Sequence, residues 1–173
     1  MAELAIWMAG HVTVALYPTL NRETVAYILD HSDAQLLFVG KLDTWDAELK
    51  HGVPEGLDRI AFPNAPKTDY VSWDDIVGKN DPISDRPLRD ADDESLIIYT
   101  SGSTGQPKGV LHSFRTISVT TKGLTGVLNA GTQDRMLSYL PLAHGMDRWL
   151  SECTSLYNGC LLYTSPSPRD RYG

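Results

Sequence analysis

The sequence contains few cysteines and no excess of positive charge. Its two cysteines among 173 residues, Cys153 and Cys160, are too few for a disulfide framework or a four-ligand zinc site. Its 15 Lys and Arg residues face 22 Asp and Glu residues, which gives a formal net charge of −7. Such a chain has no surplus of positive charge to neutralise the phosphates of a nucleic acid, so we expect no nucleic-acid partner. The cysteine count favours a reducing compartment, and we expect a soluble, cytoplasmic protein.

Long apolar runs are absent as well. No stretch reaches the roughly 18 apolar residues that a bilayer-spanning helix needs, and the first ten residues contain no basic leader. We therefore expect neither secretion nor a membrane-spanning segment. The first residues have the apolar spacing of the last two turns of a helix that ends at Gly10. Because this helix has no N-terminal cap, we expect the natural chain to begin further upstream.

Short apolar runs alternate with stretches of helical spacing along most of the chain. The runs 36–39 and 96–99 are continuously apolar, as is typical of strands buried on both faces of a parallel sheet. Other strands are expected at 12–16, 59–62, 110–111 and 136–140, and helices at 21–31, 43–50, 72–77, 113–128 and 143–157. The acidic stretch 81–94 contains prolines and is expected to be an exposed connector. This alternation predicts an α/β fold, a doubly wound and mostly parallel sheet with flanking helices.

The segment 100–109, Thr-Ser-Gly-Ser-Thr-Gly-Gln-Pro-Lys-Gly, directly follows the second continuously apolar run. It contains four hydroxyl side chains, three glycines and one lysine. Glycines let backbone N–H groups turn toward an anion, hydroxyls donate to phosphate oxygens or bind Mg²⁺, and lysine adds a mobile positive charge. The Walker A spacing fails because Pro107 precedes Lys108 and Gly109 follows it, and G-x-G-x-x-G does not fit either. The segment therefore predicts a triphosphate-binding loop rather than a flexible linker.

Residues 99–110 resemble, nearly letter for letter, the phosphate-loop signature of the adenylate-forming (AMP-binding) enzymes. That superfamily includes acyl-CoA synthetases, luciferases and the adenylation domains of peptide synthetases. Residues 10–19 resemble a strand near the start of its large N-terminal domain, and 136–144 with Asp147 and Arg148 resemble its long-chain acyl-CoA synthetase branch. The resemblance covers residues 1–159. It implies a partial N-terminal domain that is truncated at both ends.

The resemblance implies a long-chain fatty acid CoA ligase. Such an enzyme activates a fatty acid with ATP and Mg²⁺ as an acyl adenylate and transfers the acyl group to coenzyme A. The positions that match the family's phosphate-binding residues are Thr100, Ser101, Gly102, Ser103, Thr104, Gly105 and Lys108, and Thr104 is also assigned to the metal ion. His144 matches a position beside the acyl and adenylate pocket. It either orients the carboxylate as a catalytic residue or is a histidine satisfied at a helix start.

Other aromatic and histidine residues have simpler expected roles. The tryptophans are expected to be core or half-buried packing residues, although Trp149 also has a position that would border an acyl tunnel. His11, His31 and His51 show no ligand spacing and are expected at the surface.

Two other functions stay open at this point. The chain could belong to another adenylating enzyme, such as a peptide-synthetase adenylation domain, or be a non-catalytic ATP-binding module. The family's later catalytic motifs are missing from these 173 residues, so we expect the fragment alone to be inactive in thioester formation. A peripheral membrane contact of the full-length enzyme also stays open, and no basic amphipathic helix is visible.

The last residues fit none of these patterns. Residues 160–173 resemble the in-frame translation of a sequencing-library adapter, and we expect them to be read-through rather than native sequence. Pro166 and Pro168 argue against a buried strand in this segment, where the resemblance would place one.

Overall fold

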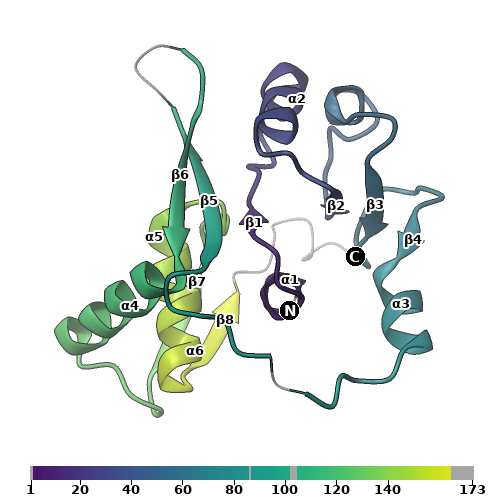
Figure 1. Cartoon of the computed structure of the whole chain (residues 1–173). Coiled ribbons are helices and arrows are strands. Elements are labelled where there is room, and N and C mark those ends of the chain that lie inside the picture. Colours follow the sequence, from purple (N-terminus) through teal and green to yellow (C-terminus); the bar gives the residue numbers. More distant parts are fainter. Residues whose placement is uncertain (1, 86, 102–104, 165–173) are drawn as a thin grey trace, which may run out of the picture. The chain divides into compact units, whose positions relative to one another are not determined.

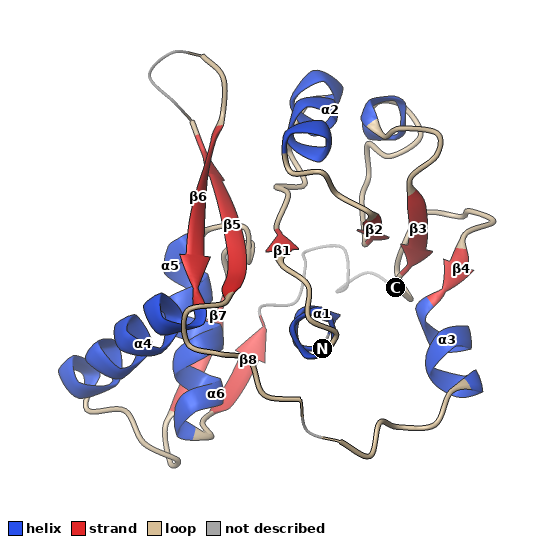
Figure 2. Cartoon of the chain, in the orientation of Figure 1, coloured by secondary structure: helices blue, strands red, loops and turns tan. Residues whose placement is uncertain are grey.

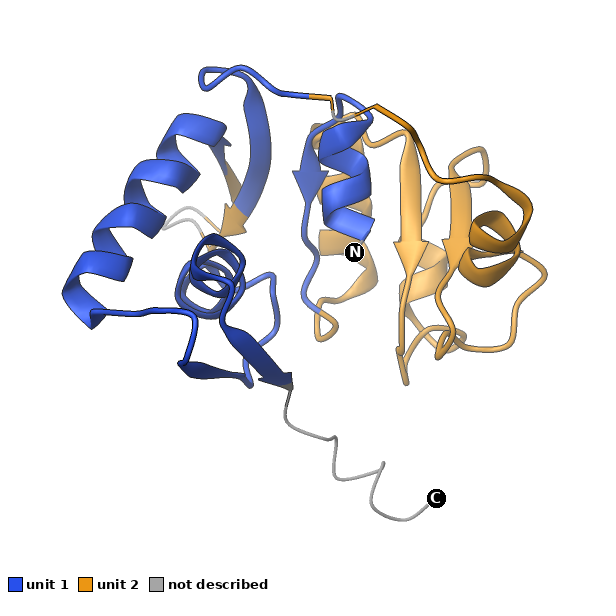
Figure 3. Cartoon of the chain, turned by 90° about the horizontal axis from the view of Figure 1, so that it is seen from below, with its two compact units in different colours: residues 1–17, 88–98, 110–173 blue, residues 18–87, 99–109 orange. Residues whose placement is uncertain are grey.

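The computed structural model describes residues 2–85, 87–101 and 105–164. The chain divides into two compact units (Figure 3). Unit 1 contains residues 1–17, 88–98 and 110–173, and unit 2 contains residues 18–87 and 99–109. Helices and short strands alternate through both units (Figures 1 and 2), and the strand pairs β1–β5, β2–β3, β3–β4 and β7–β8 are all parallel. The expected α/β class with mostly parallel strands is therefore confirmed. Within the described ranges the strands form three small sheets instead of one doubly wound sheet.

Unit 2 contains a three-stranded sheet with the order β2–β3–β4. Its elements are α2 (Arg22–His31), β2 (Leu36–Val39), the 3₁₀ helix η1 (Leu49–Gly52), β3 (Asp58–Ala61), β4 (Val71–Ser72) and α3 (Trp73–Lys79). The side chain of Asn21 caps α2 by accepting a hydrogen bond from the Thr24 N–H at 2.9 Å. The expected apolar stripe of this helix, Val25, Ile28 and Leu29, is buried. Ser72 caps α3 in the same way, as its position before Trp73 predicts.

Two expectations for unit 2 are wrong. Strand β2 forms where expected, but Leu36 is 41% exposed and only Val39 of the strand is fully buried, so the strand is not covered on both faces. Residues 43–50 do not form an α-helix, because the backbone makes turns that end in η1. Two backbone hydrogen bonds in these turns reach back five residues instead of the four of an α-helix. They run from the Leu49 N–H to the Thr44 carbonyl and from the Lys50 N–H to the Trp45 carbonyl. These turns accompany the burial of Trp45 and Leu49.

Unit 1 contains the remaining elements. They are α1 (Ala2–Met8), β1 (Thr13–Val14), β5 (Glu94–Thr100), β6 (Lys108–Ser113), α4 (Phe114–Leu128), β7 (Arg135–Ser138), α5 (Gly145–Asp147), the π-helix η2 (Arg148–Cys153), α6 (Thr154–Asn158) and β8 (Leu161–Thr164). The last two residues of β5 and the first two of β6 are assigned to unit 2. The sheet order is β1–β5–β6, with Thr13 opposite Leu96. Leu96, Ile98, Ile117 and Cys153 form the core of the unit, and Trp7 and Trp149 pack against it.

The expected helix at 143–157 occurs, but a π-helical segment interrupts it. The hydroxyl of Thr154 donates to the carbonyl of Trp149 at 2.7 Å, five residues earlier. Gly145 is needed at the start of this helix, because a Cβ there would lie 2.5 Å from the indole of Trp149. The ring of Trp149 therefore lies directly against the backbone of the preceding turn. π-helical turns are frequent at functional sites.

A strand follows Gly159, but it is not a buried one, as expected. Strand β8 forms at 161–164 and pairs in parallel with β7. Its residues Leu161 and Tyr163 are 53% and 45% exposed, so the strand is formed but not buried. The leucines, Tyr163 and Thr164 lie before the prolines and suit a strand. Pro166 and Pro168 lie outside the described residues, and the foreign origin of 160–173 stays a prediction.

Candidate functional site

The candidate phosphate loop joins β5 to β6. The buried apolar residues of β5 end at Tyr99, and Thr100 and Lys108 face each other at the two strand ends. The hydroxyl of Thr100 donates to the carbonyl oxygen of Lys108 at 3.5 Å. Gly105 has a φ of +87°, a left-handed conformation that favours glycine. The hydrogen bond between Thr100 and Lys108 therefore holds together the two strand ends that flank the loop.

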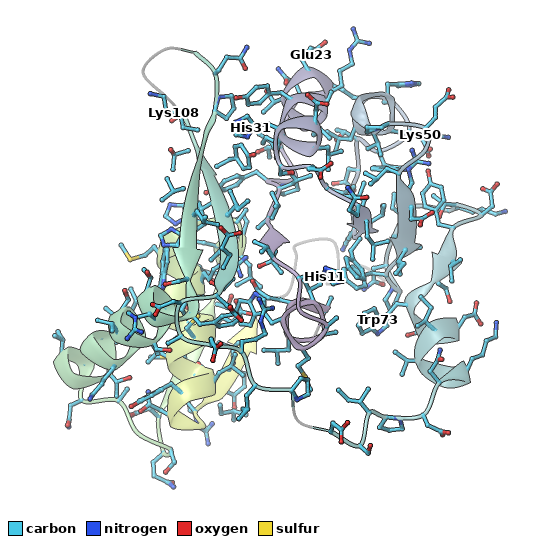
Figure 4. The ribbon with its side chains drawn as sticks, in the orientation of Figure 1. His11, Glu23, His31, Lys50, Trp73 and Lys108 are labelled. Carbon is cyan, nitrogen blue, oxygen red and sulfur yellow. The ribbon has the colours of Figure 1, made fainter. Side chains whose placement is uncertain are left out.

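Four of the predicted phosphate-binding residues are described, and all four are exposed. They are Thr100, Ser101, Gly105 and Lys108. The side chain of Lys108 extends from the start of β6 (Figure 4). Gly102, Ser103 and Thr104 lie outside the described residues, and the assignment of Mg²⁺ to Thr104 falls among them. In the part of the chain that the structure describes, no three His, Cys, Asp or Glu residues lie close enough together to hold a metal ion.

Tyr99, directly before the loop, makes a hydrogen bond to α2. The residue is 8% exposed, and its hydroxyl oxygen lies 2.7 Å from Nδ1 of His31. Burial raises the pKa of Tyr99, so the phenol stays protonated. His31 is exposed, as expected, but its ring contacts the rings of both Tyr27 and Tyr99. Sequence reasoning missed this contact because 68 residues separate the two partners.

His144 caps the short helix α5 in unit 1. Its Nδ1 accepts a hydrogen bond from the N–H of Met146 at 3.2 Å, and its side chain is exposed. This is the contact expected of a histidine at a helix start. A role for His144 in orienting the carboxylate stays a prediction, because His144 belongs to unit 1 and the phosphate loop to unit 2.

Trp149 packs against a second histidine, His112 of β6. The two rings are 5.0 Å apart in an edge-to-face arrangement. Burial lowers the pKa of His112, which favours the neutral imidazole. The indole Nε1 of Trp149 is buried, and no residue that the structure describes provides it with a hydrogen-bond partner. The packing role expected of Trp149 is confirmed, whereas its role beside an acyl tunnel stays a prediction.

A buried ionic cluster lies on the π-helical segment next to His144. The guanidinium of Arg148 pairs with the carboxylate of Glu3, lies 3.6 Å from the carboxylate of Glu152 and donates to the Leu142 carbonyl at 3.0 Å. Asp147 does not pair with Arg148. It accepts hydrogen bonds from the hydroxyls of Ser138 at 2.6 Å and Ser151 at 3.2 Å. The four-residue spacing of Arg148 and Glu152 could have predicted their contact from the sequence, but nothing in it points to Glu3.

Two carboxylates share one cation in this cluster, and this changes the ionisation of Glu152. Burial first, and then the charge of Glu3, raise the pKa of Glu152 from 4.5 to about 7, although Arg148 opposes the shift. Between pH 4.5 and about pH 7, the folded chain therefore holds a proton on Glu152 that the unfolded chain has released. Folding stability falls as the pH rises through the interval between these two values.

We expect Glu152→Gln to stabilise the protein in a pH-dependent manner. The amide carries no charge, so the free energy of unfolding should rise by about 1–2 kcal/mol at pH 8 and change little at pH 4.5. Hydrogen exchange of the α4 amides as a function of pH measures the effect in this unit. A gain of the same size at both pH values would mean that the charge of Glu152 is not its cause.

Three comparisons place the chain among known proteins. A family model described as AMP-binding enzyme matches residues 1–172. Long chain acyl-CoA synthetase 4 of Arabidopsis thaliana is 32% identical over 164 residues, which are 83% of this chain and 24% of that protein. Long-chain-fatty-acid–CoA ligase 2 of Schizosaccharomyces pombe is 30% identical over 170 residues, which are 88% of this chain and 24% of that protein. The chain spans about a quarter of the length of these relatives.

A solved structure agrees with the fold. The crystal structure of the anthranilate CoA ligase AuaEII in complex with anthranoyl-AMP superposes with a TM-score of 0.82 at 20% identity, over 97% of this chain and 33% of that one. At this identity the likeness shows the fold alone. Among the described helices, none has the length and apolar character that crossing a membrane requires.

Proposed function

Because this chain belongs to the AMP-binding enzyme family, we propose that it supplies the phosphate-binding part of a long-chain fatty acid CoA ligase. The observation that carries the proposal is the segment 100–109, whose sequence combines hydroxyls, glycines and a lysine directly after a buried strand, and whose Thr100 and Lys108 are joined by a hydrogen bond. The two relatives named above as long-chain acyl-CoA synthetase and ligase favour a fatty acid as the substrate. The cosubstrates of the whole enzyme are then ATP and coenzyme A.

The chemistry of the proposal follows from charge. A carboxylate is a poor electrophile until one of its oxygens is bonded to phosphorus. Its attack on the α-phosphorus of ATP displaces pyrophosphate, which leaves with charge that must be stabilised. Exposed Lys108 and the hydroxyls of Thr100 and Ser101 have the donors for the β and γ oxygens of the triphosphate. These residues bind and orient, and we assign them no covalent step.

The proposal includes a Mg²⁺ ion bound with the triphosphate. Hydroxyl and phosphate oxygens are suitable ligands for this hard cation, and we assign the hydroxyl of Thr104 to it. The ion would neutralise charge on the triphosphate. For His144 we propose a position beside the carboxylate of the acid, where an imidazole N–H can donate a hydrogen bond.

Pyrophosphate exchange in a full-length protein that contains this segment tests the function. We expect labelled pyrophosphate to enter ATP only when a fatty acid is present. Exchange that depends on an amino acid would indicate a peptide-synthetase adenylation domain instead. MgATP binding without exchange for any acid would leave a non-catalytic ATP-binding module, and no MgATP binding at all would overturn the proposal.

A further inference from the structure

A hydrogen bond within unit 2 connects the end of α2 to the base of the candidate phosphate loop. Nδ1 of His31 lies 2.7 Å from the hydroxyl oxygen of Tyr99, and the two rings meet edge to face with centroids 5.8 Å apart. Tyr99 is followed directly by Thr100 and Ser101, the first hydroxyl residues of the loop. The position of the Tyr99 side chain therefore influences where the backbone of Thr100 and Ser101 lies.

The helix that carries His31 is well fixed in its unit. Its start is capped by Asn21, and its apolar stripe is buried. Near this start, Gly52 lies so close that a Cβ on it would be 2.2 Å from the carbonyl oxygen of Arg22. At the other end, the ring of Tyr27 lies 5.4 Å from that of His31, on the same helix. The imidazole is thus presented to Tyr99 by a firmly packed element.

The Tyr99 side chain has little freedom of its own except at its hydroxyl. The ring is almost fully buried, and burial keeps the phenol protonated. A buried hydroxyl needs a partner, and His31 Nδ1 provides one. A loop that binds an anion through several donors binds more tightly when those donors are held in place beforehand.

We propose that His31 is a positioning residue for nucleotide binding, which acts through its hydrogen bond to Tyr99 and so holds Thr100 and Ser101 in place. The inference rests on the proposed function, since it concerns the same loop. It assigns to α2 a part in ATP binding that is exerted through Tyr99. His31 makes no contact with substrate in this proposal and has no role in the reaction itself.

Isothermal titration with MgATP of a full-length protein that contains this segment tests the inference in four variants: His31→Leu, Tyr99→Phe, the double variant and His31→Asn. We expect each of the first two to raise the Kd for MgATP about 3- to 10-fold, the size expected for one hydrogen bond. The double variant should be no weaker than the weaker single variant, because both changes remove the same bond. His31→Asn should bind within about twofold of the wild type, since its amide can occupy the place of Nδ1.

Two further variants keep the test decisive. His31→Gln retains a polar amide but places it beyond the position of Nδ1, so it should raise the Kd for MgATP as much as His31→Leu does. If the leucine variant does not fold, the glutamine variant takes its place in the test. His51→Leu replaces another exposed histidine of the same unit and should leave the Kd unchanged. Additive losses in the double variant, or equal Kd values for His31→Asn and His31→Gln, would overturn the inference and leave the proposed function standing. A wild-type full-length protein that binds no MgATP would overturn both.

Discussion

Replacing Lys108 by alanine should weaken MgATP binding about 10- to 100-fold. The estimate follows from the loss of a charge-assisted contact to phosphate, which contributes roughly 1.5–3 kcal/mol. Lys108 begins β6 and is exposed, so the substitution removes no packing contact of a buried side chain. Calorimetric titration with MgATP of a full-length protein that contains this segment measures the change in Kd.

The control for this prediction is Lys79→Ala in the same unit. Lys79 is exposed at the end of α3, where its ammonium group lies 3.9 Å from the carboxylate of Asp75. Its removal subtracts the same charge from the chain and should change the Kd less than twofold. Lys108→Arg should bind more tightly than Lys108→Ala because the positive charge remains. Equal Kd values for wild type and Lys108→Ala would remove Lys108 from the phosphate site.

Replacing Arg148 by alanine should destabilise unit 1 by about 3–5 kcal/mol at pH 8. The reason is the pair of carboxylates that would lose their shared cation, because an unpaired charge left in a buried place is costly. The side chain of Arg148 is 4% exposed, and those of Glu3 and Glu152 are 13% and 16% exposed. The loss should be smaller at pH 5.5, since Glu152, with its pKa of about 7, is then protonated. The urea dependence of hydrogen exchange in α4 measures this free energy.

Arg115→Ala provides the matched comparison. Arg115 also pairs with a carboxylate, Asp92, at 2.6 Å, but the two side chains are 59% and 79% exposed. Arg115→Ala should therefore cost much less stability than Arg148→Ala, because water screens an exposed ion pair of this kind. A similar loss for the two arginine variants would show that burial of the Arg148 cluster is not what makes it important.

The elements that the sequence predicted well are those with clear local signals. Helix α4 has a serine cap, Ser113, and a buried stripe that includes Ile117 and Thr121, and it begins and ends where expected. Strand β5 was visible as a continuous apolar run, and Gly10 ends α1 in a left-handed conformation. The family and its α/β fold were predicted correctly, because the phosphate-loop signature spans twelve consecutive residues at 99–110.

The errors arose where long-range packing overrides local spacing. The pattern at 43–50 has the periodicity of a helix, but the burial of Trp45 accompanies irregular turns. The π-helical segment is accompanied by a hydrogen bond from the Thr154 side chain to the Trp149 carbonyl, which no periodicity shows. For the candidate site, the loop could be read directly, whereas the bond between His31 and Tyr99 could not, because it joins residues far apart in the chain.

Cys153 has a practical consequence for labelling experiments. It lies in the core of unit 1, where burial raises its pKa to about 12, so almost none of it is thiolate at neutral pH. Cys160 is the other cysteine in the sequence, and it is partly exposed. A maleimide dye added to the folded chain should therefore attach at Cys160 and spare Cys153. Such a dye would report on the start of the segment 160–173, which we expect to be read-through, without any engineered change to the protein.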